Sequence, residues 1–241
     1  MSHTNENTIS RYDSQNGRYL DATSVPKGPT FFIPRSDIAY VVSTESNLLV
    51  EYDLNTASVS RSYRTGVEPF YASISRLGRV AYVTNKGEDT ISVVDLLNGL
   101  STIVKLPIGS QPEGCKLTAR DEYLLVAASG LGSLLFINTT SMQLDASIAV
   151  GNKPSYVDLA DDGIYAFVTN YGDGTLSVIN TENKYVYETV RVGSNPSVVR
   201  VFGPNLFVSN EQSGTITVAQ ILPWSNKNKN KKNKNKNKKK N

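Results

Sequence analysis

Three charged residues occupy equivalent places in a repeating sequence, and their types could hold an anion. Each lies four residues after the proline of a Gly-x-x-Pro turn, and the three are Lys116, Asp158 and Arg200. Ammonium and guanidinium groups bind carboxylate and phosphate oxygens through charge-assisted hydrogen bonds. One hypothesis is therefore an anion site in which Lys116 and Arg200 contact the ligand and Asp158 holds them in place. The alternative is a ladder of ion pairs that joins neighbouring strands.

Other polar residues beside the same turns extend this candidate site. Glu113, Tyr71 and Tyr156 lie one or two residues after a turn proline, so they begin the strands that follow these turns. We predict that they help to bind a ligand. The alternative is ordinary polar turn surface.

Enzymatic chemistry has few candidate residues here. The only histidine is His3, which argues against histidine-based acid–base catalysis and against a metal site with several histidine ligands. Cys115 has no histidine partner, which favours an inert buried thiol over a nucleophile. Asp161 and Asp162 belong to a "DDG" turn, and no phosphate-binding or dinucleotide glycine motif is present. We therefore expect a binding protein with no cofactor, no metal and no catalytic residue.

Two repeated features show what positions these residues. The six-residue stretch "TISVVD", ending at Asp95, has counterparts ending at Asp13, Asp53, Asn138, Asn180 and Gln220, with spacings of 40, 42, 43, 42 and 40. The turn prolines Pro29, Pro69, Pro112, Pro154 and Pro196 are spaced 40, 43, 42 and 42. Two features with the same period indicate a repeated structural unit.

Each period contains four short apolar runs, rich in Val, Ile, Tyr, Phe and Thr, which predict strands. In the copy from Gly151 they are "SYVDLA", "YAFVTN", "TLSVIN" and "YVYETVRV". No stretch has a convincing helical period, so we expect almost no helix. Four antiparallel strands in one period are typical of a β-propeller blade, which predicts an all-β fold.

The turn residues have structural roles in this interpretation. We expect the glycine of Gly-x-x-Pro to allow positive φ, and the proline to fix φ where the next inner strand begins. The Asp or Asn that closes each third strand is expected to cap its own turn. The Gly-x-x-Pro turn and the turn between the second and third strands should lie on one face of the propeller.

At these residues the chain resembles the YVTN-type β-propeller repeat proteins. The matching residues are "YVTN" at 82–85 with "TISVVD" at 90–95, and "FVTN" at 167–170 with "TLSVIN" at 175–180, each followed by a Gly-x-x-Pro turn. The resemblance covers nearly all of residues 1–221. It implies a propeller, commonly seven-bladed, outside the cytoplasm at a cell surface or in the periplasm. The family is also related in shape to lactonase propellers, so a hydrolase or lyase that uses channel carboxylates is the alternative to a binding role.

The number of repeats leaves the closure of the ring open. Residues 1–225 divide into copies near 1–28, 29–68, 69–111, 112–153, 154–195 and 196–222, whereas seven blades would need roughly 290 residues at this period. Either a five-bladed ring closes with one strand in surplus, or the chain is an open arc of a larger ring. Open edges would allow oligomerisation.

Residues 226–241 contain only lysine and asparagine, and we expect them to be disordered. Without the nine lysines of this segment, the net charge of +3 becomes −6 for residues 1–225. Nucleic-acid binding is therefore expected only through the tail, and the expected partner is a protein or a small anionic ligand. No signal peptide or membrane span is visible, so the extracytoplasmic location rests on the resemblance alone.

Overall fold

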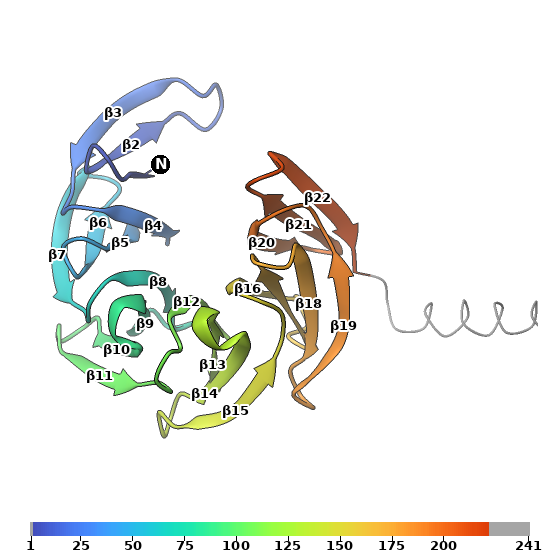
Figure 1. The fold of residues 1–241 in the computed structure, drawn as a ribbon. Coiled ribbons are helices and arrows are strands. Elements are labelled where there is room, and N and C mark those ends of the chain that lie inside the picture. Colours follow the sequence, from blue (N-terminus) through green and yellow to red (C-terminus); the bar gives the residue numbers. More distant parts are fainter. Residues whose placement is uncertain (1, 222–241) are drawn as a thin grey trace, which may run out of the picture.

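The computed structural model describes residues 2–221, which form six antiparallel sheets arranged as blades around an arc (Figure 1). This confirms the predicted all-β propeller architecture. The helices of the described residues are two single 3₁₀ turns, Lys86–Glu88 and Ser129–Leu131. No helix within residues 2–221 has the length and apolar character needed to cross a membrane. The predicted disordered tail, residues 226–241, lies outside the described part of the chain.

Four of the six blades have four strands each. Blade 2 contains β4 (Pro29–Pro34), β5 (Ile38–Ser43), β6 (Leu48–Asp53) and β7 (Ser58–Arg64). Blade 3 contains β8 (Pro69–Ile74), β9 (Val80–Asn85), β10 (Thr90–Asp95) and β11 (Ser101–Lys105). Blade 4 contains β12 (Pro112–Leu117), β13 (Tyr123–Ala128), β14 (Ser133–Asn138) and β15 (Leu144–Ala149). Blade 5 contains β16 (Pro154–Leu159), β17 (Tyr165–Asn170), β18 (Thr175–Asn180) and β19 (Tyr185–Arg191).

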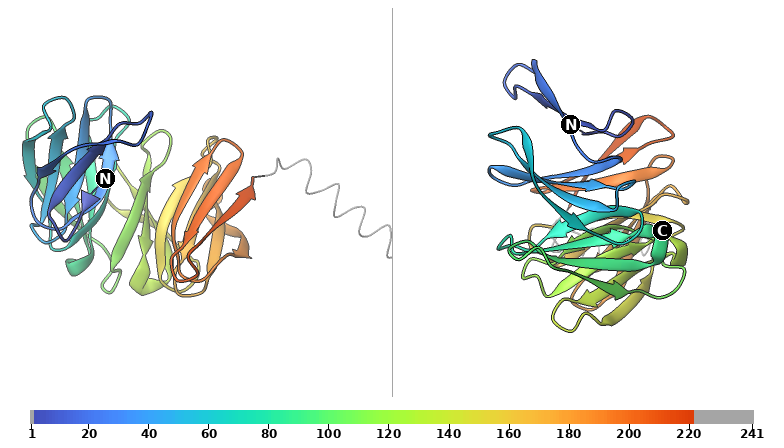
Figure 2. Two further views of the ribbon diagram at one scale, coloured as in Figure 1. Left: turned by 90° about the horizontal axis from the view of Figure 1, so that it is seen from above. Right: turned by 90° about the vertical axis from the view of Figure 1, so that its left-hand side faces the viewer.

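The blades at the two ends of the arc have three strands each. Blade 1 contains β1 (Ser2–His3), β2 (Thr8–Tyr12) and β3 (Tyr19–Ser24), and blade 6 contains β20 (Pro196–Phe202), β21 (Asn205–Asn210) and β22 (Thr215–Gln220). Blades 1 and 6 lie at opposite ends of an open arc, and no described strand of one pairs with the other (Figures 1 and 2). Of the two arrangements that the sequence allows, the structure adopts the open arc.

The turn prolines mark where the inner strands begin. The first strand of blades 2 to 6 starts at Pro29, Pro69, Pro112, Pro154 and Pro196. Each of these strands has an irregular register directly after its proline, as expected for a β-bulge. In blade 5 the Tyr171 amide donates to the Lys153 carbonyl at 3.0 Å, which joins the second-to-third-strand turn to the Gly-x-x-Pro turn. The two turns therefore lie on one face, as predicted.

The predicted role of the turn glycines is wrong at three positions. Gly66, Gly151 and Gly193 do not have positive φ, whereas Gly109 does (81°). Instead, the residue directly before each proline adopts the left-handed conformation, with φ of 72° at Gly28 and 42° to 52° at Glu68, Gln111, Lys153 and Asn195. The strained position therefore lies two residues later than expected.

Close packing explains the three glycines. A Cβ at Gly151 would lie 2.5 Å from the Asn170 side chain, and the equivalent atoms at Gly66 and Gly193 would meet Asn85 and Asn210 in the same way. Asn170 accepts a hydrogen bond from the Gly151 amide at 3.1 Å and donates to Thr175 and Ser177 at 2.9 Å. Asparagine, glycine and the two hydroxyl residues therefore form one interlocked unit within a blade.

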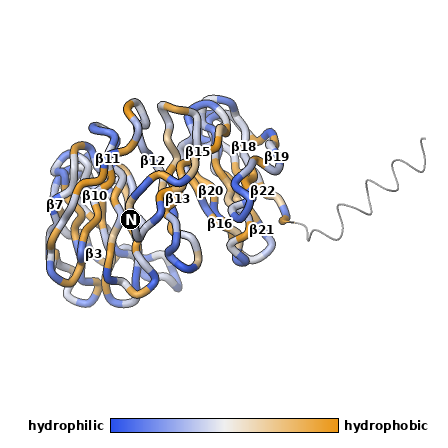
Figure 3. Tube along the Cα trace, turned by 90° about the horizontal axis from the view of Figure 1, so that it is seen from below, coloured by the Kyte–Doolittle hydropathy of each residue, from blue (hydrophilic) through white to orange (hydrophobic). Residues whose placement is uncertain are grey.

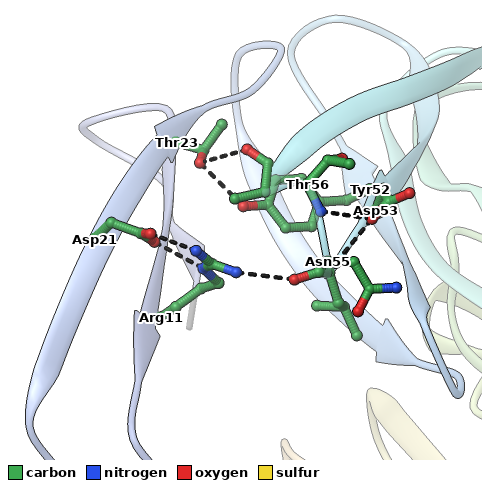
Figure 4. Close-up of polar contacts among 9 residues, drawn as sticks. Arg11, Asp21, Thr23, Tyr52, Asp53, Asn55 and Thr56 are labelled. Carbon is green, nitrogen blue, oxygen red and sulfur yellow. Dashed lines mark hydrogen bonds and ion pairs between the residues drawn. The ribbon is translucent and has the colours of Figure 1, made fainter.

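The Asp or Asn that closes a third strand caps its own turn, as predicted. Asp53 Oδ1 accepts hydrogen bonds from the Asn55 and Thr56 amides at 2.8 Å (Figure 4). Asp95 holds the next turn through the Leu97 and Asn98 amides. These backbone donors lower the pKa of both carboxyl groups, because they stabilise the ionised form.

The core lies between the faces of adjacent blades, while polar residues gather in the turns (Figure 3). Blade 4 is the most deeply buried: Leu124 to Ala128 and Leu134 to Phe136 have no exposed surface. Polar side chains also join neighbouring blades. At the junction of blades 1 and 2, Arg11 pairs with Asp21 and donates to the Leu54 carbonyl at 2.8 Å (Figure 4).

Candidate ligand site in the central channel

The inner strands place two layers of equivalent residues around the centre of the arc. The first layer, two residues after each turn proline, contains Phe31, Tyr71, Gly114, Tyr156 and Val198. The second layer, two residues further on, contains Ile33, Ser73, Lys116, Asp158 and Arg200. Successive members of a layer come from neighbouring blades, so residues about 42 positions apart in sequence become neighbours in space.

The first layer forms an aromatic cluster. The ring centroids of Phe31 and Tyr71 are 3.7 Å apart, and those of Tyr71 and Tyr156 are 5.0 Å apart in an edge-to-face arrangement. The hydroxyl groups of the two tyrosines are hydrogen-bonded to each other. Gly114, between them in sequence order, has a packing role: a Cβ there would lie 2.8 Å from backbone atoms of Ser155 and Tyr156.

Burial determines the protonation of this cluster. Tyr71 and Tyr156 are 7 % and 4 % exposed, and desolvation raises the pKa of Tyr71 to about 12 and that of Tyr156 further. Burial also raises the pKa of the Cys115 thiol above its usual value. Both phenols and the thiol are therefore protonated near neutral pH, which suits hydrogen bonding and packing rather than base or nucleophile chemistry.

In the second layer, side chains join the inner strands of neighbouring blades. Lys116 Nζ of blade 4 lies 2.7 Å from Asp158 Oδ1 of blade 5, and the other oxygen of Asp158 accepts a hydrogen bond from the Val201 amide of blade 6 at 3.0 Å. Ser73 of blade 3 accepts a hydrogen bond from the Leu117 amide of blade 4 at 3.1 Å in the same manner. Both oxygens of the buried Asp158 are therefore held by protein donors.

Arg200 has a different environment from Lys116. Its guanidinium carbon lies 4.9 Å from the centroid of the Tyr156 ring, a cation–π contact, and it forms none of the ion pairs found within residues 2–221. The side chain is exposed. Arg200 can therefore contact a ligand without breaking an ion pair.

A pocket of about 280 Å³ opens beside these two layers, at the far ends of the inner strands. Phe31 and Tyr71 form part of its aromatic wall, next to Cys115. Its charged lining residues are Arg35, Arg76, Lys116, Arg200 and Asp121. Positive charge therefore exceeds negative charge in a partly enclosed site, where screening by water is reduced.

The structure separates one predicted site residue from the other five. Tyr71, Tyr156, Lys116, Asp158 and Arg200 lie in the two inner layers, where Tyr156 contacts Tyr71 and Arg200, and Lys116 pairs with Asp158. Of the five, Tyr71, Lys116 and Arg200 line the pocket. Glu113 instead lines a different pocket, on the face that carries the Gly-x-x-Pro turns, and its Oε1 lies 2.7 Å from Lys86 Nζ. Glu113 therefore does not share a site with Arg200.

Arg35 and Arg76 line the candidate pocket, and the sequence reasoning missed them. They follow the first strands of blades 2 and 3, beyond the repeated positions used to find the other residues. Arg35 donates to the Arg76 carbonyl at 3.2 Å, and the Arg76 amide donates to Asp121 at 2.8 Å. An arginine within two residues of the end of the first strand in two successive repeats was the signal that could have identified them.

An apolar groove of about 290 Å³ lies between blades 5 and 6, lined by residues that include Phe167, Leu176 and Val178. At the preceding junction, Val186 of β19 packs in the cluster that contains the equivalent residues of blade 4. The groove therefore matches the place of a fourth strand, and we do not consider it a ligand site.

Comparison with solved structures supports the fold. The chain resembles the Kuenenia stuttgartiensis hydrazine synthase (TM-score 0.67, 24 % identity), with 79 % of this chain and 58 % of that chain covered. An inactive histidine-to-alanine variant of the Staphylococcus aureus virginiamycin B lyase with quinupristin has a TM-score of 0.79 at 15 % identity, covering 91 % of this chain and 75 % of that chain. A putative 6-phosphogluconolactonase from Bacteroides uniformis has a TM-score of 0.74 at 14 % identity, covering 88 % of this chain and 73 % of that chain.

This chain therefore spans less than two thirds of the hydrazine synthase chain and about three quarters of the other two. No protein-family model matches the sequence, and no curated protein matches it significantly. At these identities the similarity is one of fold, and the activity must be argued from the site itself.

Proposed function

We propose that this chain is a non-enzymatic β-propeller binding protein that holds a small anionic ligand in the channel pocket. The observation that carries the proposal is the charge of the lining: Arg35, Arg76, Lys116 and Arg200 face a pocket whose only acidic lining residue is Asp121. Arginine offers planar, bidentate hydrogen bonding to carboxylate and phosphate groups. Phe31 and Tyr71 add an apolar wall for the body of the ligand.

The carboxylates near the channel favour binding over catalysis. Asp158 is held by Lys116 and the Val201 amide, and Asp121 accepts a hydrogen bond from the Arg76 amide. Glu113 is paired with Lys86 in the other pocket. A general base must be available to a substrate proton, and both oxygens of Asp158 are already held by protein donors, so Asp121 is the acidic lining residue left for the runner-up.

The runner-up is a hydrolase or lyase of the propeller-lactonase kind, which the fold similarity to virginiamycin B lyase and putative lactonases supports. Replacing one histidine by alanine makes that lyase catalytically inactive. The one histidine of this chain, His3, lies in β1 at the end of the arc. Lactone turnover that is lost in Asp121→Asn would favour the runner-up.

The YVTN and Gly-x-x-Pro motifs further support membership of the YVTN-type repeat family, with a location outside the cytoplasm.

Binding of inorganic phosphate and of citrate, measured by calorimetry, tests the proposal. Arg200→Gln should weaken binding roughly tenfold or more, because a charge-assisted hydrogen bond contributes about 1.5–3 kcal/mol. The matched control is Arg191→Gln, since Arg191 is an exposed arginine on β19 outside the pocket. Equal binding by the wild type and Arg200→Gln, or equal weakening by both variants, would reject an anion site at Arg200.

A further inference from the structure

One face of blade 6 exposes apolar residues whose counterparts are covered in blade 5. Phe207, Ile216 and Val218 are 38 %, 67 % and 61 % exposed. The equivalent residues Phe167 and Leu176 of blade 5 are 5 % and 3 % exposed. The registers agree, because Phe207 pairs with Val218 as Phe167 pairs with Val178. We call this surface of β21 and β22 the blade 6 end face.

Within the chain, this type of face packs against the next blade. Phe167 and Leu176 of blade 5 pack in one cluster with Leu206 and Val208 of blade 6. Similar clusters join blades 4 and 5, and blades 1 and 2. The sequence therefore builds two complementary sheet faces, and each inter-blade contact joins one of each kind.

The opposite end of the arc leaves the complementary face open. Tyr12 of β2 is 44 % exposed, whereas its equivalents Val94 and Ile179 have no exposed surface. Tyr12 packs edge to face against Tyr19 of β3, which is 55 % exposed, with their ring centroids 5.7 Å apart. We call this surface of β2 and β3 the blade 1 end face. Figure 1 places the two end faces on either side of the opening in the arc.

We propose that the blade 6 end face of one copy docks on the blade 1 end face of a second copy, so that chains associate head to tail. The second copy carries, in β2 and β3, the two outer strands of the kind of face that packs on this surface at the inter-blade junctions. The charge pattern permits the contact, because neither β21 ("NLFVSN") nor β22 ("TITVAQ") contains a charged residue. Soluble proteins normally protect an open sheet edge with charges, and β22 lacks this protection.

This contact is heterologous, which gives it a specific signature. Each bound copy still presents one free end face, so assembly continues with concentration instead of stopping at a symmetric dimer. A variant in which only one end face is blocked should still bind a partner through its other end face. Two variants blocked at opposite ends should therefore form a dimer that cannot grow.

The experiment measures the mass of the full chain by light scattering over a wide concentration range, at moderate salt to screen the lysines of residues 226–241. We expect the mass of the wild type to rise with concentration. Val218→Lys and Tyr12→Lys should each remain monomeric, and an equimolar mixture of the two should have twice the monomer mass. Ile103→Lys, which replaces a 48 % exposed residue of β11 in blade 3, should associate like the wild type.

Three results would overturn the proposal: a monomeric wild type at every concentration, a monomeric mixture, or a dimer that Val218→Lys abolishes and Tyr12→Lys leaves intact. The last result would mean that blade 6 binds blade 6. Circular dichroism checks that the variants fold. Ile216→Lys and Tyr19→Lys replace exposed residues of the same two faces, so they repeat the test if a first variant is unstable.

Discussion

At the scale of single residues, the position four residues after the turn proline joins neighbouring blades in some repeats and can contact a ligand in another. Ser73 and Asp158 both accept a backbone amide from the next blade. Lys116 pairs with Asp158 across the same junction. Arg200 occupies the equivalent position in the last described blade, and it makes a cation–π contact with Tyr156 instead. A cross-blade ion pair and an anion site can therefore coexist, with Lys116 paired to Asp158 and Arg200 available to a ligand.

The aspartates that cap the third-strand turns should make stability depend on pH. The folded-state pKa values of Asp53 and Asp95 are lowered from 3.8, chiefly by backbone hydrogen bonds. Their contribution is therefore fully present above the unfolded pKa and is lost as the pH falls through the lower folded pKa. The double variant Asp53→Asn, Asp95→Asn should be less stable than the wild type near neutral pH, and this difference should shrink below about pH 4. Urea unfolding at a series of pH values measures the difference.

A third-strand turn that is capped by asparagine allows the reverse substitution, asparagine to aspartate, to serve as a control. Asn138 caps the equivalent turn of blade 4 through the Thr140 and Ser141 amides. Asn138→Asp should add the same kind of pH dependence that the double variant removes. Stability curves that run parallel to the wild-type curve at all pH values would contradict the proposed effect of these caps.

At the scale of structural elements, the turn glycine and the last residue of the second strand act together. Gly151 and Asn170 are 19 residues apart, and a Cβ at position 151 would overlap the asparagine side chain. Gly151→Ala should therefore lower the free energy of unfolding by about 1–3 kcal/mol through overpacking. Asn170→Ala should also be destabilising, because it leaves buried polar partners unsatisfied.

A double-mutant cycle separates this explanation from a purely backbone one. Asn170→Ala removes the atoms that the new Cβ would meet. Gly151→Ala should therefore lower the free energy of unfolding by less in the Asn170→Ala background than in the wild type. Urea unfolding of the four proteins gives the coupling energy. Strictly additive effects would mean that the glycine is required for its backbone conformation instead.

This pair also shows what the sequence could predict and what it could not. Strand positions follow from local patterns: short apolar runs rich in Val, Ile, Tyr, Phe and Thr, and a proline that fixes φ at the start of each inner strand. The reason for Gly151 was not predictable in the same way, because it depends on the side chain of Asn170, 19 residues later in the sequence. The channel residues were found because equivalent repeat positions form layers. Arg35 and Arg76 lie beyond those positions, in irregular turns whose direction the period does not specify.

At the scale of the whole molecule, the open arc gives the blades unequal environments. Blade 4 is covered on both faces, and most of β13 and β14 has no exposed surface. In blades 1 and 6 one face is open, as the exposure of Tyr12 and Val218 shows. In repeat architectures each unit is stabilised mainly by its neighbours, so a unit with one neighbour is expected to open more easily.

Amide hydrogen exchange of the monomeric Val218→Lys variant should therefore follow the order of the blades. We expect the slowest exchange in β13 and β14 and the fastest in β2 and β22, because opening an end blade disrupts one inter-blade interface and opening blade 4 disrupts two. Uniform protection of blades 1 to 6 would instead mean that the arc closes on itself in solution and covers its end faces within one molecule. Addition of wild-type chain should selectively slow exchange in β2, because β2 forms the blade 1 end face that Val218→Lys leaves intact. Protection that appears equally in all six blades would not be explained by docking at that face.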